Sequence, residues 1–179
     1  NVIRNRRDQL DSTLIRGGLL IKFISEDTLN LISLHDCIIE EVSTEGQNLL
    51  LVFEHIDVLS EHPLNDTGNA MYTGQALITF VDYEIVESIL YDTSGIHGKK
   101  RIAVEEDAQK IEIEFAELMV DFEVLKNEEI QTSGSYFIHR FDGSTSLKYN
   151  ADFGYWIIKY KNLIIEWEEF LDKAWFERR

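Results

Sequence analysis

The stretch LHDCIIEEVSTEGQNLLLVFEHIDVL, residues 34–59, decides the fold. Two apolar runs, at 37–42 and 49–59, flank the polar segment STEGQN at 43–48. Gly46 in that segment can take the positive φ that a tight β-hairpin turn needs. The apolar start of the second run is typical of a strand that is buried on both faces. The stretch therefore predicts an antiparallel hairpin, and the rest of the chain is interpreted outward from it.

Strand-like patterns continue on the C-terminal side of this hairpin. Residues 60–74 hold the only proline and many turn-forming residues, and they predict a long loop. Residues 75–92 alternate in hydrophobicity, which predicts one long strand or two paired strands. Residues 155–170 predict a last hairpin with a tight turn at 161–162, because asparagine tolerates the left-handed region.

Three short helical segments are expected around the sheet. Residues 1–18 predict a short helix or a basic arm that ends at two glycines. The helical spacing of apolar residues from Phe115 predicts a helix near 111–120, and similar spacing predicts a short C-terminal helix within 168–179. The expected class is α+β, with a predominantly antiparallel sheet built from hairpins. We expect one domain over 1–179, with a division into a sheet unit at 1–95 and a helix-plus-sheet unit at 96–179 as the alternative.

Negative charge is the strongest feature of the composition. The chain has 17 Lys and Arg against 33 Asp and Glu, a formal net charge of −16, which disfavours binding to nucleic acid. Residues 23–98 carry 14 acidic side chains and no lysine or arginine. This segment predicts a negative surface that serves solubility or binds a basic protein. The residues expected to bind such a partner are Glu54, Asp57, Glu61 and Asp66.

The adjacent residues His35, Asp36 and Cys37 raise the question of a nucleophilic site. Neighbouring side chains on a strand point to opposite faces, so three contiguous residues make a poor catalytic triad. Cys37 is expected to be a small buried residue, and we predict no catalytic residues. His35, Cys37, His55 and His62 are kept as weaker candidates.

Metal and cofactor motifs are weak. His55 and Asp57 are two positions apart, and such spacing on a strand is compatible with two metal ligands. No second cysteine, zinc-type helix motif or calcium-binding loop completes a site, and no glycine-rich phosphate loop is present. We therefore predict neither a metal nor a cofactor.

Cysteine usage and hydropathy bear on the compartment. One cysteine cannot form a disulfide within the chain, which is typical of a reducing environment. No apolar run approaches the roughly 20 residues of a membrane helix. These features predict a cytoplasmic protein that does not bind membranes, and they leave its oligomeric state open.

Aromatic residues gather in the last quarter of the chain. Trp156 and Trp167 lie in the expected last hairpin, and Trp175 follows closely. Core packing is the simpler explanation, whereas an aromatic pocket for a ligand is the alternative. A hydrolase that uses His and carboxylate groups is a further alternative.

Two stretches resemble a family of small uncharacterised bacterial proteins: residues 34–59 and IEWEEFLDKAWFE at 165–177. In that family a His-Asp-Cys entry to a hairpin precedes an acidic apolar strand, and the chain closes on Trp-Asn-Glu-Phe followed by Ala-Trp-Phe. In this chain Glu168 replaces the asparagine. The family has no assigned activity, and some similar acidic proteins are regarded as immunity proteins of bacterial toxin systems. The resemblance implies a non-catalytic interaction module that caps a basic partner such as a toxin.

Overall fold

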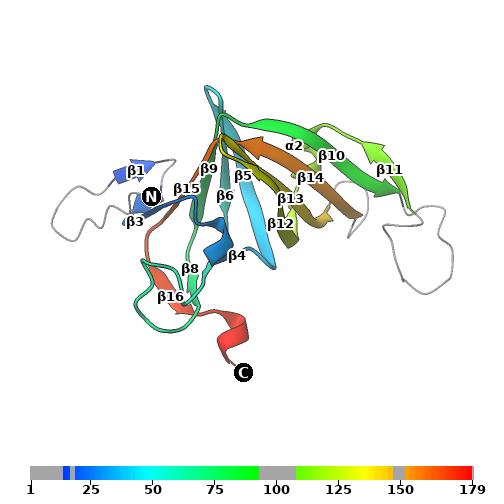
Figure 1. Ribbon diagram of the computed structural model, residues 1–179. Coiled ribbons are helices and arrows are strands. Elements are labelled where there is room, and N and C mark those ends of the chain that lie inside the picture. Colours follow the sequence, from blue (N-terminus) through cyan, green and yellow to red (C-terminus); the bar gives the residue numbers. More distant parts are fainter. Residues whose placement is uncertain (1–13, 17–18, 93–107, 147–151, 179) are drawn as a thin grey trace.

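The computed structural model describes residues 14–16, 19–92, 108–146 and 152–178. Most of these residues lie in antiparallel strands (Figure 1). The described part of the chain contains one helix of a single turn, α2 (Phe115–Leu118), and two 3-10 turns, η1 (Leu29–Leu31) and η2 (Trp175–Arg178). The predicted antiparallel sheet is confirmed, but the α+β class is wrong, because the fold is roughly all-β.

Three sheets hold the described strands. A two-stranded sheet pairs β1 (Leu14–Arg16) with β2 (Leu19–Ile21). A four-stranded sheet has the order β16-β8-β7-β4, and a ten-stranded sheet has the order β11-β10-β14-β13-β12-β5-β6-β9-β15-β3. The bounds of the small sheet are β16 Phe170–Lys173, β8 Met71–Thr73, β7 Asp57–Val58 and β4 Ile32–Ser33. The bounds of the large sheet are β11 Gln109–Glu112, β10 Glu84–Asp92, β14 Asp152–Tyr160, β13 Tyr136–Thr145, β12 Glu123–Ser133, β5 Cys37–Glu45, β6 Asn48–Phe53, β9 Ala76–Val81, β15 Asn162–Trp167 and β3 Phe23–Glu26.

The large sheet closes on itself because two long neighbouring strands bend at the same place. β9 continues into β10 across Asp82 and Tyr83, and β14 continues into β15 across Lys161. β9 pairs with β15 and β10 pairs with β14, so the two long strands stay side by side through the bend. The remaining neighbours, β13, β12, β5 and β6, complete the circuit back to β9. Figure 1 shows both bends together near the top of the view.

The bend corrects the prediction of a last hairpin. β14 and β15 do not pair with each other, since β14 lies between β10 and β13 whereas β15 lies between β9 and β3. Asp82 takes a φ of 50° at the matching point of the other long strand, and the Lys161 amide donates to the Val81 carbonyl oxygen at 2.9 Å. Lys161 therefore marks a bend between β14 and β15. The chain keeps its direction there and gains new neighbouring strands.

The hairpin predicted from residues 34–59 is present as β5 and β6. Glu45 pairs with Asn48 across a two-residue turn, and Gly46 has a φ of 62°. A glycine with positive φ at the first turn position is typical of a type II′ hairpin, whose twist matches that of the flanking strands. At its other end β5 pairs with β12 through Cys37 and Ile38, and this short contact closes the circuit.

Aromatic side chains fill the space inside the closed sheet. Trp156 and Phe141 stack with ring centroids 4.2 Å apart, and Phe80 meets both rings edge-on. Trp156 and Trp167 have no exposed surface, whereas Trp175 is 44% exposed. Burial of side chains this large supplies the main stabilisation of such a core, on the order of 25 cal/mol per Å² of apolar surface.

The predicted helix near 111–120 is mostly a strand. Ile111 pairs with Leu90, which extends the sheet by β11, and only residues 115–118 form a helical turn. Leu118 of this turn lies against Gly154 of β14, where an added Cβ would come within 2.8 Å of the Leu118 side chain. Residues 109–112 form β11 by pairing with β10, so the helical spacing of apolar residues from Phe115 produces only one packed helical turn.

The predicted C-terminal helix is also wrong. Phe170 pairs with Thr73 and Lys173 pairs with Met71, so the segment is strand β16 followed by the 3-10 turn η2. Helices of so few residues are marginal in water, and an available strand edge offers better backbone hydrogen bonding.

Two further predictions fall partly or wholly outside the described residues. The N-terminal helix or arm falls on residues 1–13 and 17–18, which are not described, and residues 14–16 form β1. Strands from both sides of residue 95 share the large sheet, as the β10–β14 and β5–β12 pairs show. Within the described residues no helix has the length and apolar character needed to cross a membrane.

Candidate functional site

The His-Asp-Cys segment forms a turn that separates its three side chains. Asp36 takes a φ of 64° and its amide donates to the Val124 carbonyl oxygen at 2.8 Å. His35 and Asp36 are exposed and lie together, with His35 Nδ1 2.9 Å from Asp36 Oδ1. Cys37 points inward and has no exposed surface.

The chemistry of Cys37 is that of a buried thiol. Its Sγ lies 3.8 Å from the backbone oxygen of His35 and 3.9 Å from that of Ser33. Burial raises the pKa of the thiol well above its usual range, and the carboxylates of Asp57, Glu54 and Asp36 raise it further. A nucleophilic cysteine needs the thiolate form, which this environment disfavours.

Asp57 is the most unusual ionisable residue of the described chain. Its side chain is fully buried, and neither carboxylate oxygen has a hydrogen-bond partner among the described residues. Burial raises the pKa of this carboxyl, which His55 and Arg178 partly oppose through their charge. Buried carboxyl groups without partners are rare, because removing such a group from water is costly.

Residues far apart in the sequence surround Asp57. The His55 ring stacks on Tyr72 at 4.4 Å, and His55 Nδ1 lies 3.3 Å from Glu54 Oε1. Burial is the main cause that raises the pKa of Tyr72, and the charges of Glu54 and Asp57 raise it further. Asp36 and Cys37 from the turn, together with these residues and Arg178 of η2, form what we call the Asp57 cluster. The exposed Trp175 borders it, with its ring 6.2 Å from that of His35.

His62 is a structural histidine. Its Nδ1 accepts a hydrogen bond from the Leu64 amide at 3.1 Å, so Nε2 carries the proton and faces Ser25 Oγ at 3.0 Å. The ring meets Trp167 edge-on, and burial lowers the His62 pKa to about 4. His62 and His55 therefore serve different parts of the fold, and their proximity in the sequence creates no joint site.

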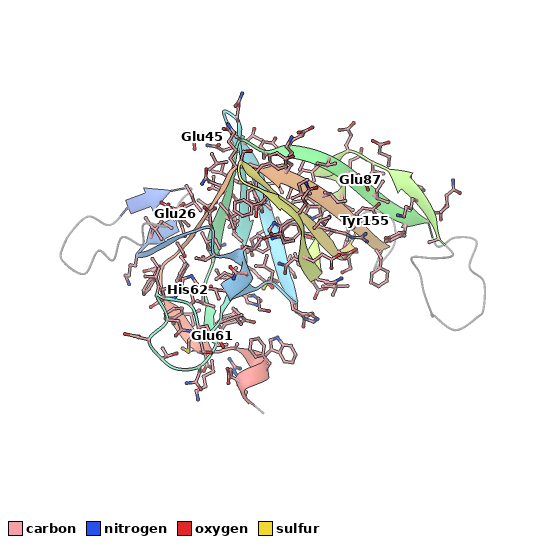
Figure 2. All side chains as sticks on the ribbon, viewed as in Figure 1. Glu26, Glu45, Glu61, His62, Glu87 and Tyr155 are labelled. Carbon is pink, nitrogen blue, oxygen red and sulfur yellow. The ribbon has the colours of Figure 1, made fainter. Side chains whose placement is uncertain are left out.

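The four residues expected to bind a partner differ in exposure. Glu61 and Asp66 are exposed on the loop between β7 and β8, and Figure 2 shows Glu61 on the outside of that loop beside His62. Glu54 is half-buried and Asp57 is inaccessible. An acidic contact surface must therefore use other acids of residues 23–98 in place of Asp57.

Exposed acids are available elsewhere on that segment. Glu26, Glu41 and Glu61 are exposed, and no lysine or arginine among the described residues lies within ion-pair distance of them. Asp82 and Glu84, by contrast, pair with Lys161 at 2.8 Å and Lys159 at 3.3 Å. Residues 23–98 thus keep part of their negative charge uncompensated after folding.

A polar network that the sequence analysis missed covers one face of β10, β13 and β14. The Arg140 guanidinium lies 4.0 Å above the Tyr155 ring and its Nε contacts both Asp142 oxygens at 3.0 Å. The Tyr155 hydroxyl donates to Glu87 at 2.7 Å, and Figure 2 shows these two residues together. Burial and Glu87 raise the Tyr155 pKa to about 12. The sequence places these polar side chains at alternating positions of their strands, which could have indicated a polar sheet face. Only the order of β10, β14 and β13 in the sheet brings the side chains into contact.

An open hollow of about 600 Å³ lies at the corner where the long strands bend. Its walls combine tyrosine rings with charged groups, and Lys159 Nζ lies 4.7 Å from the ring centre of Tyr136. The lining residues are Gly46, Gln47, Asp82, Tyr83, Glu84, Ser135, Tyr136, Lys159, Tyr160 and Lys161. No local sequence pattern predicts this hollow, because two hairpin tips and two strand bends from distant parts of the chain form it.

Metal ligation has no support in the described part of the chain, where no three His, Cys, Asp or Glu side chains are placed to hold a metal ion. Comparison with known proteins adds no identity: no family model matches the chain, and no curated protein or solved structure matches it significantly.

Proposed function

We propose that this protein is a non-catalytic interaction module that binds a basic protein through the exposed acids of residues 23–98. The observation that carries the proposal is that Glu26, Glu41 and Glu61 are exposed and form no ion pair with a lysine or arginine among the described residues, in a segment with 14 acids and no lysine or arginine. Charge complementarity of this kind accelerates encounter and excludes like-charged partners. The immunity-like capping of a basic toxin implied by the family resemblance is one form of this function.

The two alternatives have less support. For a hydrolase, Cys37, Asp57 and His62 are buried, and the exposed His35 and Asp36 lie on a turn from which Cys37 points inward. For an aromatic pocket built from the C-terminal tryptophans, Trp156 and Trp167 have no exposed surface, and of the three only Trp175 is exposed.

The test begins with affinity capture from bacterial lysate at low salt, identification of captured proteins, and purification of any basic candidate. The triple variant Glu26→Gln, Glu41→Gln, Glu61→Gln is then compared with Glu112→Gln, Glu114→Gln, Glu117→Gln, a matched change outside the segment. We expect the first triple to weaken binding by about tenfold at low salt, through slower association, and the second to leave it nearly unchanged. Failure to capture any basic protein, or equal effects of the two triples, would contradict the proposal.

A further inference from the structure

The outer edge of β5 is open over residues 41–44. β5 pairs with β6 along its inner edge, but its contact with β12 is limited to Cys37 and Ile38. No other described strand pairs with residues 41–44, and Ser43 and Thr44 are exposed. Backbone groups on such an edge can hydrogen-bond to a strand of another chain.

The turn geometry identifies the backbone groups that face outward. In a two-residue hairpin the residues that flank the turn exchange both backbone hydrogen bonds, and such pairs alternate along the ladder. Glu45 and Asn48 flank this turn, and the register is regular from there to Glu41. The amide and carbonyl groups of Val42 and Thr44 therefore point away from β6, toward the open edge.

The edge of β12 is better protected against pairing with another strand than the edge of β5. β12 has bulges after Val124 and after Glu129, and Lys126 lies between them. Bulges and lysines are the usual means by which proteins keep a strand edge from pairing. β5 has one register irregularity of its own, between Ile39 and Glu41, but the register is regular over residues 41–45 and these residues include no lysine or proline, so this part of the edge is the less protected one.

The charge of β5 selects the occupant. Glu40 and Glu41 are both exposed at the start of the open edge. A second copy paired through the same edge would bring glutamates of the two copies close together, which is unfavourable, whereas a lysine-containing strand would meet opposite charge. A basic segment is therefore favoured over self-association.

The corner hollow lies at the end of the same edge. Gly46 and Gln47 follow β5 directly and line the hollow, opposite Tyr136. Lys159 lies over the Tyr136 ring and pairs with Glu84, and Lys161 pairs with Asp82, so residues of this chain already balance the charges of the hollow. The charge that selects a basic segment is therefore that of Glu40 and Glu41, and the hollow marks where the open edge ends.

We propose that the open edge of β5 accepts an extended basic segment of the partner as an added β-strand that ends at the corner hollow. This inference rests on the proposed function and adds the mode of recognition: backbone pairing with Val42 and Thr44, selected by Glu40 and Glu41. Main-chain hydrogen bonds supply affinity in such strand addition, and the charges supply specificity.

The test uses two synthetic octapeptides with equal charge. One alternates lysine and valine, and the other alternates lysine and proline, which lacks the amide donor and cannot form a regular ladder. We expect the lysine–valine peptide to bind at least tenfold more tightly. We also expect it to slow hydrogen exchange at the amides of Val42 and Thr44, as measured by residue-resolved exchange.

A pair of protein variants sharpens the result. Thr44→Pro removes the outward amide without changing charge, and Thr44→Val retains that amide. We expect Thr44→Pro to lower the affinity for the lysine–valine peptide to that of the lysine–proline peptide, and Thr44→Val to bind like the unchanged protein. Thermal unfolding checks that both variants fold, and the exchange measurement on the unchanged protein stands if Thr44→Pro does not.

The outcomes separate the two proposals. If neither peptide binds at low salt, both the strand addition and a general preference for basic partners are contradicted. Equal affinity of the two peptides, or protection at another edge in place of Val42 and Thr44, overturns the strand addition alone and leaves charge-based binding in place.

Discussion

Trp156 and Asp57 are equally buried, yet their surroundings are opposite in kind. Trp156 stacks on Phe141 and meets Phe80 and Phe115 at their edges, so most of its large apolar surface is in contact with other rings. Asp57 lies beside Cys37 and His55 with both carboxylate oxygens unpaired among the described residues. The first environment stabilises the fold, whereas the second lowers its stability.

The contrast shows that burial alone does not tell whether a residue stabilises this fold. A core of stacked rings needs no explanation beyond stability, but a buried carboxyl without partners has to be tolerated by the rest of the fold. The Asp57 cluster is also the place where the turn at His35, the end of β6 and the C-terminal turn η2 converge. Variants of Trp156 and Asp57 test whether the two regions differ in this way, and His62, a buried ionisable residue outside both regions whose ring is hydrogen-bonded, sharpens the comparison with Asp57.

Truncation in the aromatic core is expected to have the largest effect. Trp156→Ala removes a fully buried ring and leaves a cavity among Phe141, Phe80 and Phe115. We expect a loss of about 3–5 kcal/mol in the free energy of unfolding, measured by urea denaturation. The control is Trp175→Ala, where the side chain is 44% exposed and the loss should stay within about 1 kcal/mol. Similar losses at both positions would contradict the assignment of Trp156 to the core.

Protonation of His62 is expected to have the next largest effect. Its folded pKa of about 4 lies below the ordinary value of 6.5, so the unfolded chain binds more protons between these pH values. Stability should therefore be complete above pH 6.5 and fall as pH decreases toward 4, by an amount on the order of 3 kcal/mol. Burial also lowers the pKa of His139 to about 4, so this histidine should contribute a loss of similar size. His62→Gln should therefore remove about half of this pH dependence, and the double variant His62→Gln, His139→Gln should remove most of it. An unchanged profile in His62→Gln would mean that another group carries the pH dependence.

Neutralising Asp57 is expected to have a smaller effect of opposite sign. The folded pKa of Asp57 is raised above 3.8, so the folded state holds the proton more tightly and this term weakens stability as pH rises above 3.8. Asp57→Asn should raise the free energy of unfolding at pH 7 by about 1–2 kcal/mol, and the gain should shrink toward pH 4. Asp121→Asn is the control and should change stability little, because Asp121 is exposed and asparagine tolerates its φ of 49°. A loss of stability in Asp57→Asn at pH 7 would show that the carboxylate has a stabilising partner in solution.

Parts of the fold followed from local pattern. The hairpin of residues 34–59 was predictable because Gly46 permits a type II′ turn and the flanking residues are apolar. The helices were overpredicted, since Phe115 to Phe122 and Phe170 to Trp175 show helical spacing over too few turns to outweigh strand pairing. At the candidate site, the exposure of Glu61 fitted its position in a polar loop, but the burial of Asp57 had no local signal.

The sequence by itself determined the antiparallel character of the protein, the position of its first hairpin and the excess of negative charge over residues 23–98. Only the tertiary structure decided that Asp82 and Lys161 are corners of a closed sheet, that Asp57 lies inside next to Cys37, and that the edge of β5 stays open. The physical reason is that alternation and turn residues act within a few positions along the chain. Strand partners are chosen by backbone hydrogen bonds and packing between residues far apart in the chain, as between Cys37 of β5 and Val124 of β12 or between Phe23 of β3 and Trp167 of β15.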